Sequence, residues 1–381
     1  PEGRIGIYVG SHTHFSEKQN RAIDRFCATY DAVVICDHTS GYYGKYKLLP
    51  TLVQLQSDIT SPFPPLDLMV HIGEISAASF NDTIPAKEVW RVSEDGELRD
   101  PFKKLTTVFQ MSEEMFFLHY GKDGCNRHVL IDECRELFGE IYEQIPELPF
   151  CNIWTAMQLS SRLPKGALFH MGVSNTRRCW NMFQLPESVE SACNVGCCGI
   201  DGCVSTLVGA SLVNPDRLCY VVVGDLTFFY DLNSLGNHHI GTNLRVMLVN
   251  NGRGTEFRLG IHHCNVFGDD ADKYMAAAGH FGNKSPLLVK HYAEDLGFHY
   301  LSATTKEEFM TALSNFTNPQ LSDHSMILEV FTDSKDESEA LYLMSHIQSD
   351  AKGMVRSKLK DAVRNVAGEK GINAIKKILK K

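Results

Sequence analysis

This chain of 381 residues lacks the features that define several large protein classes. Its apolar runs stay shorter than the roughly 18 residues that a membrane-spanning helix needs. Its 12 cysteines include no Cys-x-x-Cys pair and lie in apolar stretches or beside glycine, which disfavours a disulfide scaffold and favours a reduced, cytoplasmic compartment. Acidic residues (46) outnumber lysine and arginine (37), and the net charge of −9 argues against a nucleic-acid-binding protein.

The first ten residues contain no initiator methionine and no signal peptide, because they lack a basic start and a long apolar segment. They already form a strand-like run. Tag removal or residue numbering is one explanation of this start, and a start partway through a larger protein is the other. The motifs described below favour the second explanation, which we state as an expectation.

The first 110 residues alternate between short apolar runs and polar stretches. Nearly continuous apolar runs, separated by segments long enough for helices such as 16–29, are typical of a parallel sheet covered on both faces. The predicted strands are residues 5–9, 32–36, 66–72, 89–92 and 106–109.

An amphipathic stretch at 126–145 leads into Pro146 and Pro149, which mark a linker. A second alternating unit begins near Cys151. Its predicted strands are 167–171, 218–223, 244–250 and 326–331, and its predicted helices are 154–163, 202–212 and 306–316. We therefore predict an α/β protein with two three-layer, parallel-sheet domains, 1–148 and 149–348. Ligands of such domains bind beyond the carboxyl ends of the strands.

The last segment, 349–381, differs in composition from the rest of the chain. Between residues 352 and 381 there are ten basic and two acidic residues, and apolar residues recur at helical spacing. A basic, amphipathic helical tail is therefore predicted. Binding to a membrane surface or a partner is one role for it, and packing on the acidic body of its own chain is another. The sequence leaves that role open.

Two strand ends in the second unit carry polar turns. One apolar strand ends at Gly224-Asp225, and the next one along the chain ends at an Asn-Asn pair that includes Asn251. If the two strands are parallel neighbours, both turns lie at the same edge of the sheet. There the side-chain oxygens of Asp225 and Asn251, together with the backbone carbonyl of Arg253, would offer three oxygen ligands to Mg²⁺.

The first of these turns also suits a phosphate. Gly224 permits its close approach, and a helix beginning near Tyr230 would direct N–H groups toward it. The order of Gly-Asp, a helix, and Asn-Asn after a strand resembles the diphosphate-binding motif of enzymes that depend on thiamine diphosphate (ThDP). No Walker lysine loop competes with this interpretation, and the Gly-Arg-Gly at 252–254 lacks the dinucleotide-binding pattern.

The segments around this motif narrow the resemblance. Gly-Ile-Asp-Gly-Cys-Val-Ser-Thr at 199–206, followed by Gly-Asp-Leu at 224–226 and Tyr-Asp-Leu-Asn at 230–233, is similar to the MenD family of 2-succinyl-5-enolpyruvyl-6-hydroxy-3-cyclohexene-1-carboxylate synthases. Residues 88–101 resemble the middle domain of that family. The resemblance covers about residues 1–345. It implies that 1–148 is a Rossmann-like middle domain and that 149–348 is the ThDP diphosphate-binding domain.

The resemblance also assigns roles to particular residues. It places Ile200 beneath the cofactor as the apolar wedge that holds ThDP in a V shape. Without the motif, an isoleucine after glycine would be interpreted as a residue of the hydrophobic core. Arg178 is similar to the arginine that grips a substrate carboxylate, with Arg177 as its rival. The implied cofactor-binding residues are Ser174, Gly199, Ile200, Asp201, Gly224, Asp225, Leu226, Asn251 and Phe257, and the implied metal ligands are Asp225, Asn251 and Arg253.

Three departures from the family pattern stand out. Val195 lies where the family usually has an arginine, which weakens the case for the MenD substrate pair. Arg253 adds a cation where the family tends to have small residues, and it would either restore that charge or cover the phosphates. The activating glutamate of the family belongs to an N-terminal pyrimidine-binding domain, and no glutamate of this chain, Glu256 included, matches that site. The catalytic residues are therefore left unassigned.

Histidines and cysteines near the motif suggest further chemistry. His262 and His263, just past the cofactor loop, are candidates for an acid or base near neutral pH. Adjacent histidines point in different directions, so neither this pair nor the pair at 238–239 is expected to bind a metal. Cys197 and Cys198 are expected to be small packing residues rather than nucleophiles.

The sequence thus predicts part of a ThDP- and Mg²⁺-dependent enzyme that decarboxylates a 2-oxo acid and joins the remainder to an acceptor. A MenD-like enzyme would use 2-oxoglutarate and isochorismate. The alternatives are a 2-oxo acid decarboxylase or carboligase of another pathway, favoured by Val195, and a cofactor-binding subunit that is inactive without a pyrimidine-domain partner. A homodimer or tetramer is expected of the intact enzyme, with no nucleic-acid partner.

Overall fold

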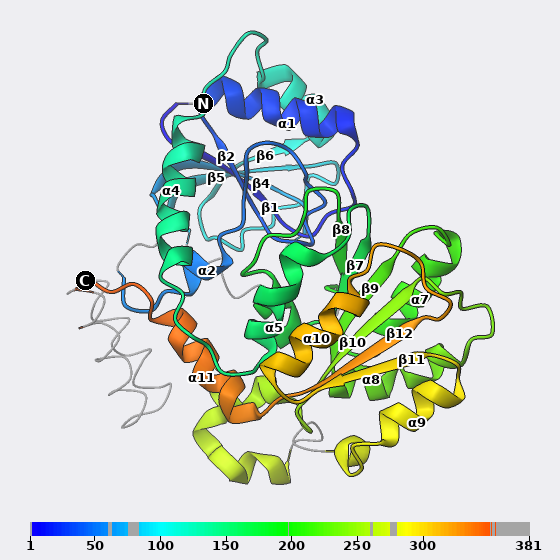
Figure 1. Cartoon of the computed structure of the whole chain (residues 1–381). Helices are drawn as coiled ribbons and strands as arrows, with labels where there is room; N and C mark the ends of the chain where they lie inside the picture. The colour runs from blue at the N-terminus through cyan, green and yellow to red at the C-terminus, as the bar shows by residue number, and fades with distance from the viewer. Residues whose placement is uncertain are drawn as a thin grey trace.

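The computed structural model describes residues 2–59, 63–74, 84–196, 198–259, 262–274 and 280–350, together with residues 352 and 355. Two six-stranded sheets organise the chain, and all of their strand pairings are parallel. Helices flank both sheets (Figure 1), which confirms the predicted α/β class with two parallel-sheet domains. The domain boundaries at 148 and 348 stay predictions, and most of the predicted tail, 349–381, lies outside the described residues.

The first sheet has the strand order β3-β2-β1-β4-β5-β6. Its strands are β1 (Ile5–Val9), β2 (Val33–Cys36), β3 (Lys47–Leu48), β4 (Leu66–Ile72), β5 (Ala86–Ser93) and β6 (Leu105–Gln110). Its accompanying helices are α1 (Glu17–Tyr30), α2 (Thr51–Leu55), α3 (Glu113–Tyr120) and α4 (Val129–Glu143). The predicted strands are confirmed, and among the described residues of this sheet the two-residue β3 alone was missed, because a strand this short leaves no apolar run. Ser16 and Gln19 form a capping box at the start of α1, which follows β1 after the connection formed by residues 10–16.

The second sheet has the order β11-β12-β10-β9-β7-β8. Its strands are β7 (Leu168–Met171), β8 (Glu190–Cys193), β9 (Cys219–Gly224), β10 (Leu244–Asn250), β11 (His299–Ala303) and β12 (Met326–Phe331). The four central strands are those that the sequence predicted. The edge strands β8 and β11 were missed because they are partly exposed and carry polar residues, so they form no apolar run.

Helices cover both faces of the second sheet. They are α5 (Asn152–Leu159), α6 (Asn175–Trp180), α7 (Cys203–Val213), α8 (Asp225–Tyr230), α9 (Leu288–Asp295), α10 (Lys306–Phe316) and α11 (Ser334–Ser345). Short 3-10 turns are η2 (Ser160–Arg162), η3 (Leu232–Gly236), η4 (Thr255–Arg258), η5 (His263–Lys273) and η7 (Phe281–Asn283). In β9, Val221 and Val223 pack in a cluster with α7, whereas Tyr220 and Val222 belong to the cluster that contains α10. This alternation explains why β9 is apolar throughout. In the described part of the chain, no helix has the length and apolarity required to cross a membrane.

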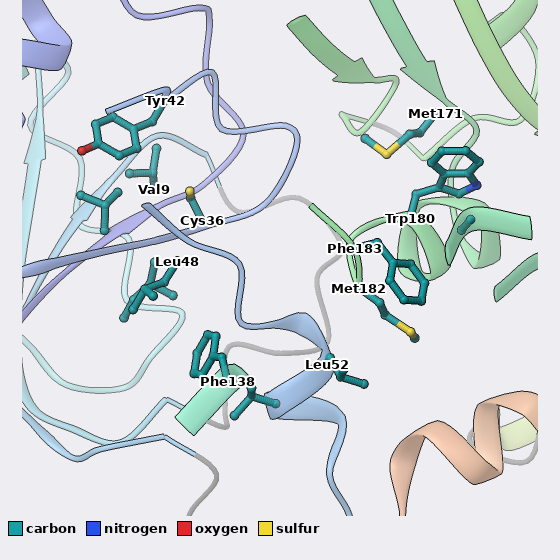
Figure 2. Close-up of a cluster of buried hydrophobic side chains, with 14 of the residues drawn as sticks. Val9, Cys36, Tyr42, Leu48, Leu52, Phe138, Met171, Trp180, Met182 and Phe183 are labelled. Atoms are coloured by element: carbon teal, nitrogen blue, oxygen red, sulfur yellow. The ribbon is translucent and has the colours of Figure 1, made fainter. Parts of the chain in front are cut away.

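One continuous cluster of buried side chains joins the two domains. Figure 2 shows part of it, with Val9 and Cys36 from strands of the first domain, Leu52 from α2, and Trp180 and Phe183 from the second domain. These five side chains are all less than one-tenth exposed. The domains therefore share apolar packing, which fixes their relative position more firmly than a flexible linker would.

Buried hydrogen bonds reinforce this interface. The backbone N–H of His38, just after β2, donates to Asn181 Oδ1 at 3.0 Å, and His38 Nε2 lies 2.8 Å from the carbonyl oxygen of Phe183. Burial lowers the pKa of the His38 imidazole to about 4, so this side chain stays neutral at physiological pH. On the other side of the interface, Gln56 Nε2 donates to the Met344 carbonyl oxygen at 2.8 Å.

A buried glutamate at the start of α11 gives the fold a testable pH dependence. Glu337 Oε1 accepts the Asn152 N–H and the Thr332 hydroxyl, both at 2.9 Å. Burial raises the pKa of its carboxyl from an ordinary 4.5 to about 7. The protonated form is therefore the one that the fold favours, and its contribution to stability is present below pH 4.5 and is lost as the pH rises through 7.

We expect Glu337→Gln to remove this loss of stability. At pH 8 the variant should have a free energy of unfolding higher than the wild type by roughly 1 to 3 kcal/mol, and the difference should shrink toward pH 5. Urea unfolding at several pH values measures it, with Glu339→Gln on the exposed side of α11 as the control. A wild-type-to-variant difference that does not change with pH would contradict the prediction.

Candidate cofactor-binding site

The two polar turns singled out in the sequence lie together at the carboxyl end of the second sheet. β9 and β10 are parallel neighbours, with Gly224 opposite Val249 in their register. The Gly252 N–H donates to Asp225 Oδ2 at 2.6 Å, so the second turn is hydrogen bonded to the side chain of the first. Asp225 is only 2% exposed. The expected meeting of the two turns is confirmed, and their role in binding a metal stays a prediction.

The helix after the first turn begins earlier than expected. α8 starts at Asp225, with Gly224 as its N-cap, and it ends at Tyr230. The prediction of a helix beginning near Tyr230 is therefore wrong. Phe228 of α8 is fully buried in the cluster with α7. Because the apolar residues of α8 directly continue the apolar run of β9, the sequence pattern did not show that a helix follows the strand without a loop. As a result, the Leu226 N–H donates to Asp225 Oδ1 at 2.8 Å, directly at the turn.

The donor set at the turns suits a hard divalent cation, although its oxygens are shared with other partners. The Asp225 carboxylate and the Asn251 amide oxygen are ligands that Mg²⁺ accepts. Asp225 Oδ2 also lies 3.1 Å from His280 Nε2, and Asn251 Oδ1 accepts the Arg253 N–H at 3.4 Å. In the described ranges, no group of three or more His, Cys, Asp or Glu side chains is placed so that it could hold a metal ion. Any metal here would therefore complete its shell with carbonyl, phosphate or water oxygens, as Mg²⁺ commonly does.

A buried carboxylate that the sequence analysis missed supports the second turn. Glu329, in the middle of β12, accepts Asn250 Nδ2 and the Tyr300 hydroxyl, both at 2.7 Å. Its side chain is 1% exposed, and this burial raises the pKa of the carboxyl. Asn250 is the last residue of β10 and directly precedes Asn251, so Glu329 fixes the point at which the turn leaves the sheet.

The motif at 199–206 forms the loop that leads into α7. The Ser205 N–H donates to Asp231 Oδ2 at 2.6 Å, so Asp231, which follows α8, caps α7 and ties this motif to the first turn. Gly202 has a φ of 121°, which favours glycine. Ile200 is half-buried and belongs to neither of the two core clusters among the described residues, whereas Asp201 is exposed. The wedge role of Ile200 stays a prediction.

A cavity lies between the domains at the carboxyl ends of strands from both sheets. Its first-domain lining includes residues that follow β1, β2 and β4. From the second domain come Ser174, Arg177, Arg178, Val195 and Glu256. Both arginines predicted to bind substrate therefore line the same cavity as Val195, the residue that departs from the family pattern. Ser174 has a φ of 60°, and such strain in a residue other than glycine is often found at functional sites.

Arg178 is paired with an acidic side chain in this cavity. Its Nη1 donates to Glu256 Oε2 at 3.0 Å, and its Nη2 donates to Glu256 Oε1 at 2.7 Å. The two residues are 78 positions apart, so no spacing pattern could have indicated the pair. Arg177 is 9% exposed, and Glu256 lies on η4 directly beside Phe257.

His262 and His263, the histidines predicted as an acid or base, follow Glu256 a few residues later in the chain. The His262 ring packs edge-on against Phe257 with centroids 5.1 Å apart, and its Nδ1 accepts the Cys264 N–H at 3.1 Å. The side chain of His263 and the whole of Cys197 lie outside the described residues. Cys198 is exposed and lines the cavity. The roles of both histidines and of both cysteines stay predictions.

The Glu329 network should be needed for the stability of the second turn. Glu329→Ala leaves the Asn250 amide buried without its acceptor, and we expect a loss of about 2 to 3 kcal/mol in the free energy of unfolding. Tyr300→Phe removes one hydrogen bond only and should cost about 1 kcal/mol. Urea unfolding measures both variants, and hydrogen exchange at Gly252 should quicken in Glu329→Ala alone. Equal losses in the two variants would show that the Asn250 contact contributes nothing.

Comparison with known proteins finds relatives among the 2-succinyl-5-enolpyruvyl-6-hydroxy-3-cyclohexene-1-carboxylate synthases. No protein-family model matches the chain. The 2-succinyl-5-enolpyruvyl-6-hydroxy-3-cyclohexene-1-carboxylate synthase of Bacteroides fragilis is 33% identical over 263 residues, which cover 68% of this chain and 45% of that protein. The synthases of Phocaeicola vulgatus and Bacteroides thetaiotaomicron are each 32% identical, over 68% of this chain and 44% of their own length. The chain thus spans less than half the length of these relatives. Over the matched two thirds of its residues, the chain is a relative of the ThDP-dependent MenD synthases, which confirms the resemblance found in the sequence.

Proposed function

We propose that this chain supplies the middle domain and the diphosphate-binding domain of a ThDP- and Mg²⁺-dependent enzyme that decarboxylates a 2-oxo acid and joins the remainder to an acceptor. The observation that carries the proposal is the 2.6 Å hydrogen bond between Gly252 N–H and Asp225 Oδ2, because it joins the two turns of the diphosphate motif. The relatedness to MenD synthases supports the same reaction class. A cytoplasmic location is part of this proposal.

Different residues at and near the two turns would bind the metal ion and the diphosphate. Asp225, Asn251 and the Arg253 carbonyl would hold Mg²⁺, and Ser174 and Leu226 would hold the diphosphate. Ile200 would support the cofactor from below, with Gly199, Asp201, Gly224 and Phe257 completing the predicted cofactor-binding set. When bound, ThDP supplies a thiazolium ring that accepts the electron pair left by decarboxylation. His262 and His263 remain the candidates for moving a proton near that ring.

Two substrate choices compete. The pair suggested by the relatives is 2-oxoglutarate with isochorismate, in a step of menaquinone biosynthesis. The second candidate is a 2-oxo acid decarboxylase or carboligase of another pathway. Val195 favours the second candidate, because an apolar side chain lines the cavity where the family usually has a carboxylate-binding arginine.

The chain is proposed to need a partner for activity. The activating glutamate of the family belongs to a pyrimidine-binding domain, and none of the glutamates in this sequence matches it. That domain would come from the remainder of a longer protein or from a separate subunit, and the cofactor would then lie between subunits of a homodimer or tetramer. No nucleic-acid partner is proposed.

Removing the proposed metal ligand tests the cofactor assignment. Asp225→Ala should weaken ThDP binding in the presence of Mg²⁺ at least tenfold, equivalent to about 1.4 kcal/mol, because one anionic ligand is lost. Isothermal titration calorimetry measures the affinity. Asp216→Ala removes the same charge from an exposed site in the same domain and should leave binding unchanged. Equal affinity of wild type and Asp225→Ala would eliminate the metal assignment.

Supplying the glutamate in trans tests the requirement for a partner. We expect the chain alone to release no CO₂ from a 2-oxo acid, and a mixture with a pyrimidine-binding domain to release it. A domain whose activating glutamate is replaced by glutamine is the matched control. Turnover of 2-oxoglutarate would favour the first substrate choice, and turnover of pyruvate-like acids alone would favour the second. Equal CO₂ release with and without the added domain would contradict the requirement.

A further inference from the structure

The cavity between the domains holds a closed ion pair where the resemblance places a substrate-binding arginine. Both terminal nitrogens of Arg178 donate to Glu256, at 3.0 and 2.7 Å. The two side chains are only 11% and 21% exposed, so solvent screens the pair incompletely. A guanidinium that binds one carboxylate through this face cannot offer the same face to another.

Neighbouring contacts hold both partners in place. Arg178 Nη1 also donates to Asn175 Oδ1 at 3.4 Å, and Asn175 is the first residue of α6, the helix that carries Arg178. Glu256 belongs to η4, a few residues after the turn that contains Asn251. The ion pair therefore connects the predicted cofactor loop to the wall of the cavity.

The other residues that line the cavity do not supply a second cation in place of Arg178, which is paired with Glu256. The charged lining residues are Arg177, Arg178, Asp37, Glu74 and Glu256. Arg177 is buried and is itself engaged in an interaction. Val195 adds an apolar side chain to the same lining. Of the acidic lining residues, Glu74 is paired with Arg91 and Arg99, and Glu256 is paired with Arg178. A second carboxylate entering the cavity would thus have to compete for a guanidinium group that is already engaged.

We propose that Glu256 is a specificity-determining residue and that the cavity takes a 2-oxo acid with an uncharged far end rather than a dicarboxylic one. The inference rests on the proposed function, since it takes this cavity as the substrate site. A dicarboxylic acid must displace Glu256 to reach Arg178, and one of the two carboxylates then loses its partner. A monocarboxylic acid requires no such exchange, because its far end can pack beside Val195.

The test compares two acids of the same length, 2-oxoglutarate and 2-oxopentanoate, which differ in the distal carboxylate. Calorimetric titration of the 381-residue chain measures binding without turnover. Wild type should bind 2-oxopentanoate at least tenfold more tightly than 2-oxoglutarate. Glu256→Gln should improve the affinity for 2-oxoglutarate at least tenfold, and adding Arg178→Gln should reverse that gain.

Glu187→Gln, which neutralises an exposed acid away from the cavity, is the control and should leave both affinities unchanged. Glu256→Ala gives the same comparison if the glutamine variant does not fold. Equal binding of the two acids by wild type, an unchanged ratio in both Glu256 variants, or no binding of either acid would each overturn the proposal. A failure of the proposed function appears elsewhere, as a ThDP affinity that does not respond to Asp225→Ala, so the two failures are distinguishable.

Discussion

The parallel pairing of β9 with β10 is the constraint on which the candidate site depends. Both strands are almost entirely buried, and the turns that bear Asp225 and Asn251 begin where each strand leaves the sheet at its carboxyl end. Because the register places Gly224 opposite Val249, the Asp225 carboxylate lies within hydrogen-bond distance of Gly252. A slip of one residue would turn every side chain of one strand to the opposite face and would separate these groups. The geometry of the site is thus set by the sheet.

Sequence patterns predicted the elements whose apolar residues follow a regular pattern. β1, β4, β10, β12 and α10 begin and end at the expected residues, because their apolar patterns are regular and their neighbours polar. The edge strands β8 and β11 of the second sheet were missed, since they bury few side chains and carry polar residues that hide an apolar run. The start of α8 was misplaced because its aromatic residues continue the apolar run of β9, and tertiary packing of Phe228 decided the conformation there.

The candidate site was predictable to the extent that its residues follow buried strands. Asp225 and Asn251 could be placed near each other on topology alone. The partners supplied by distant segments could not, because Glu256 and Glu329 are single acidic residues without any repeating spacing. Their importance depends on which arginine or amide the fold places opposite them. Of these pairs, Arg178 with Glu256 lies in the cavity and affects its charge, which is why substrate choice is harder to infer than cofactor class.

The end of the second domain is fastened back onto the first. The Ser57 N–H donates to the Ser345 carbonyl oxygen at 2.7 Å, and the Gln348 N–H donates to Gln56 Oε1 at 3.0 Å. Asp350 N–H donates to the Asp58 carbonyl oxygen at 2.8 Å. The described chain therefore makes a loop: it passes from the first domain through the second and returns. If a protease cut the connection near residue 148, these hydrogen bonds and the shared apolar cluster would still hold the two fragments together. The domains would then separate only on unfolding.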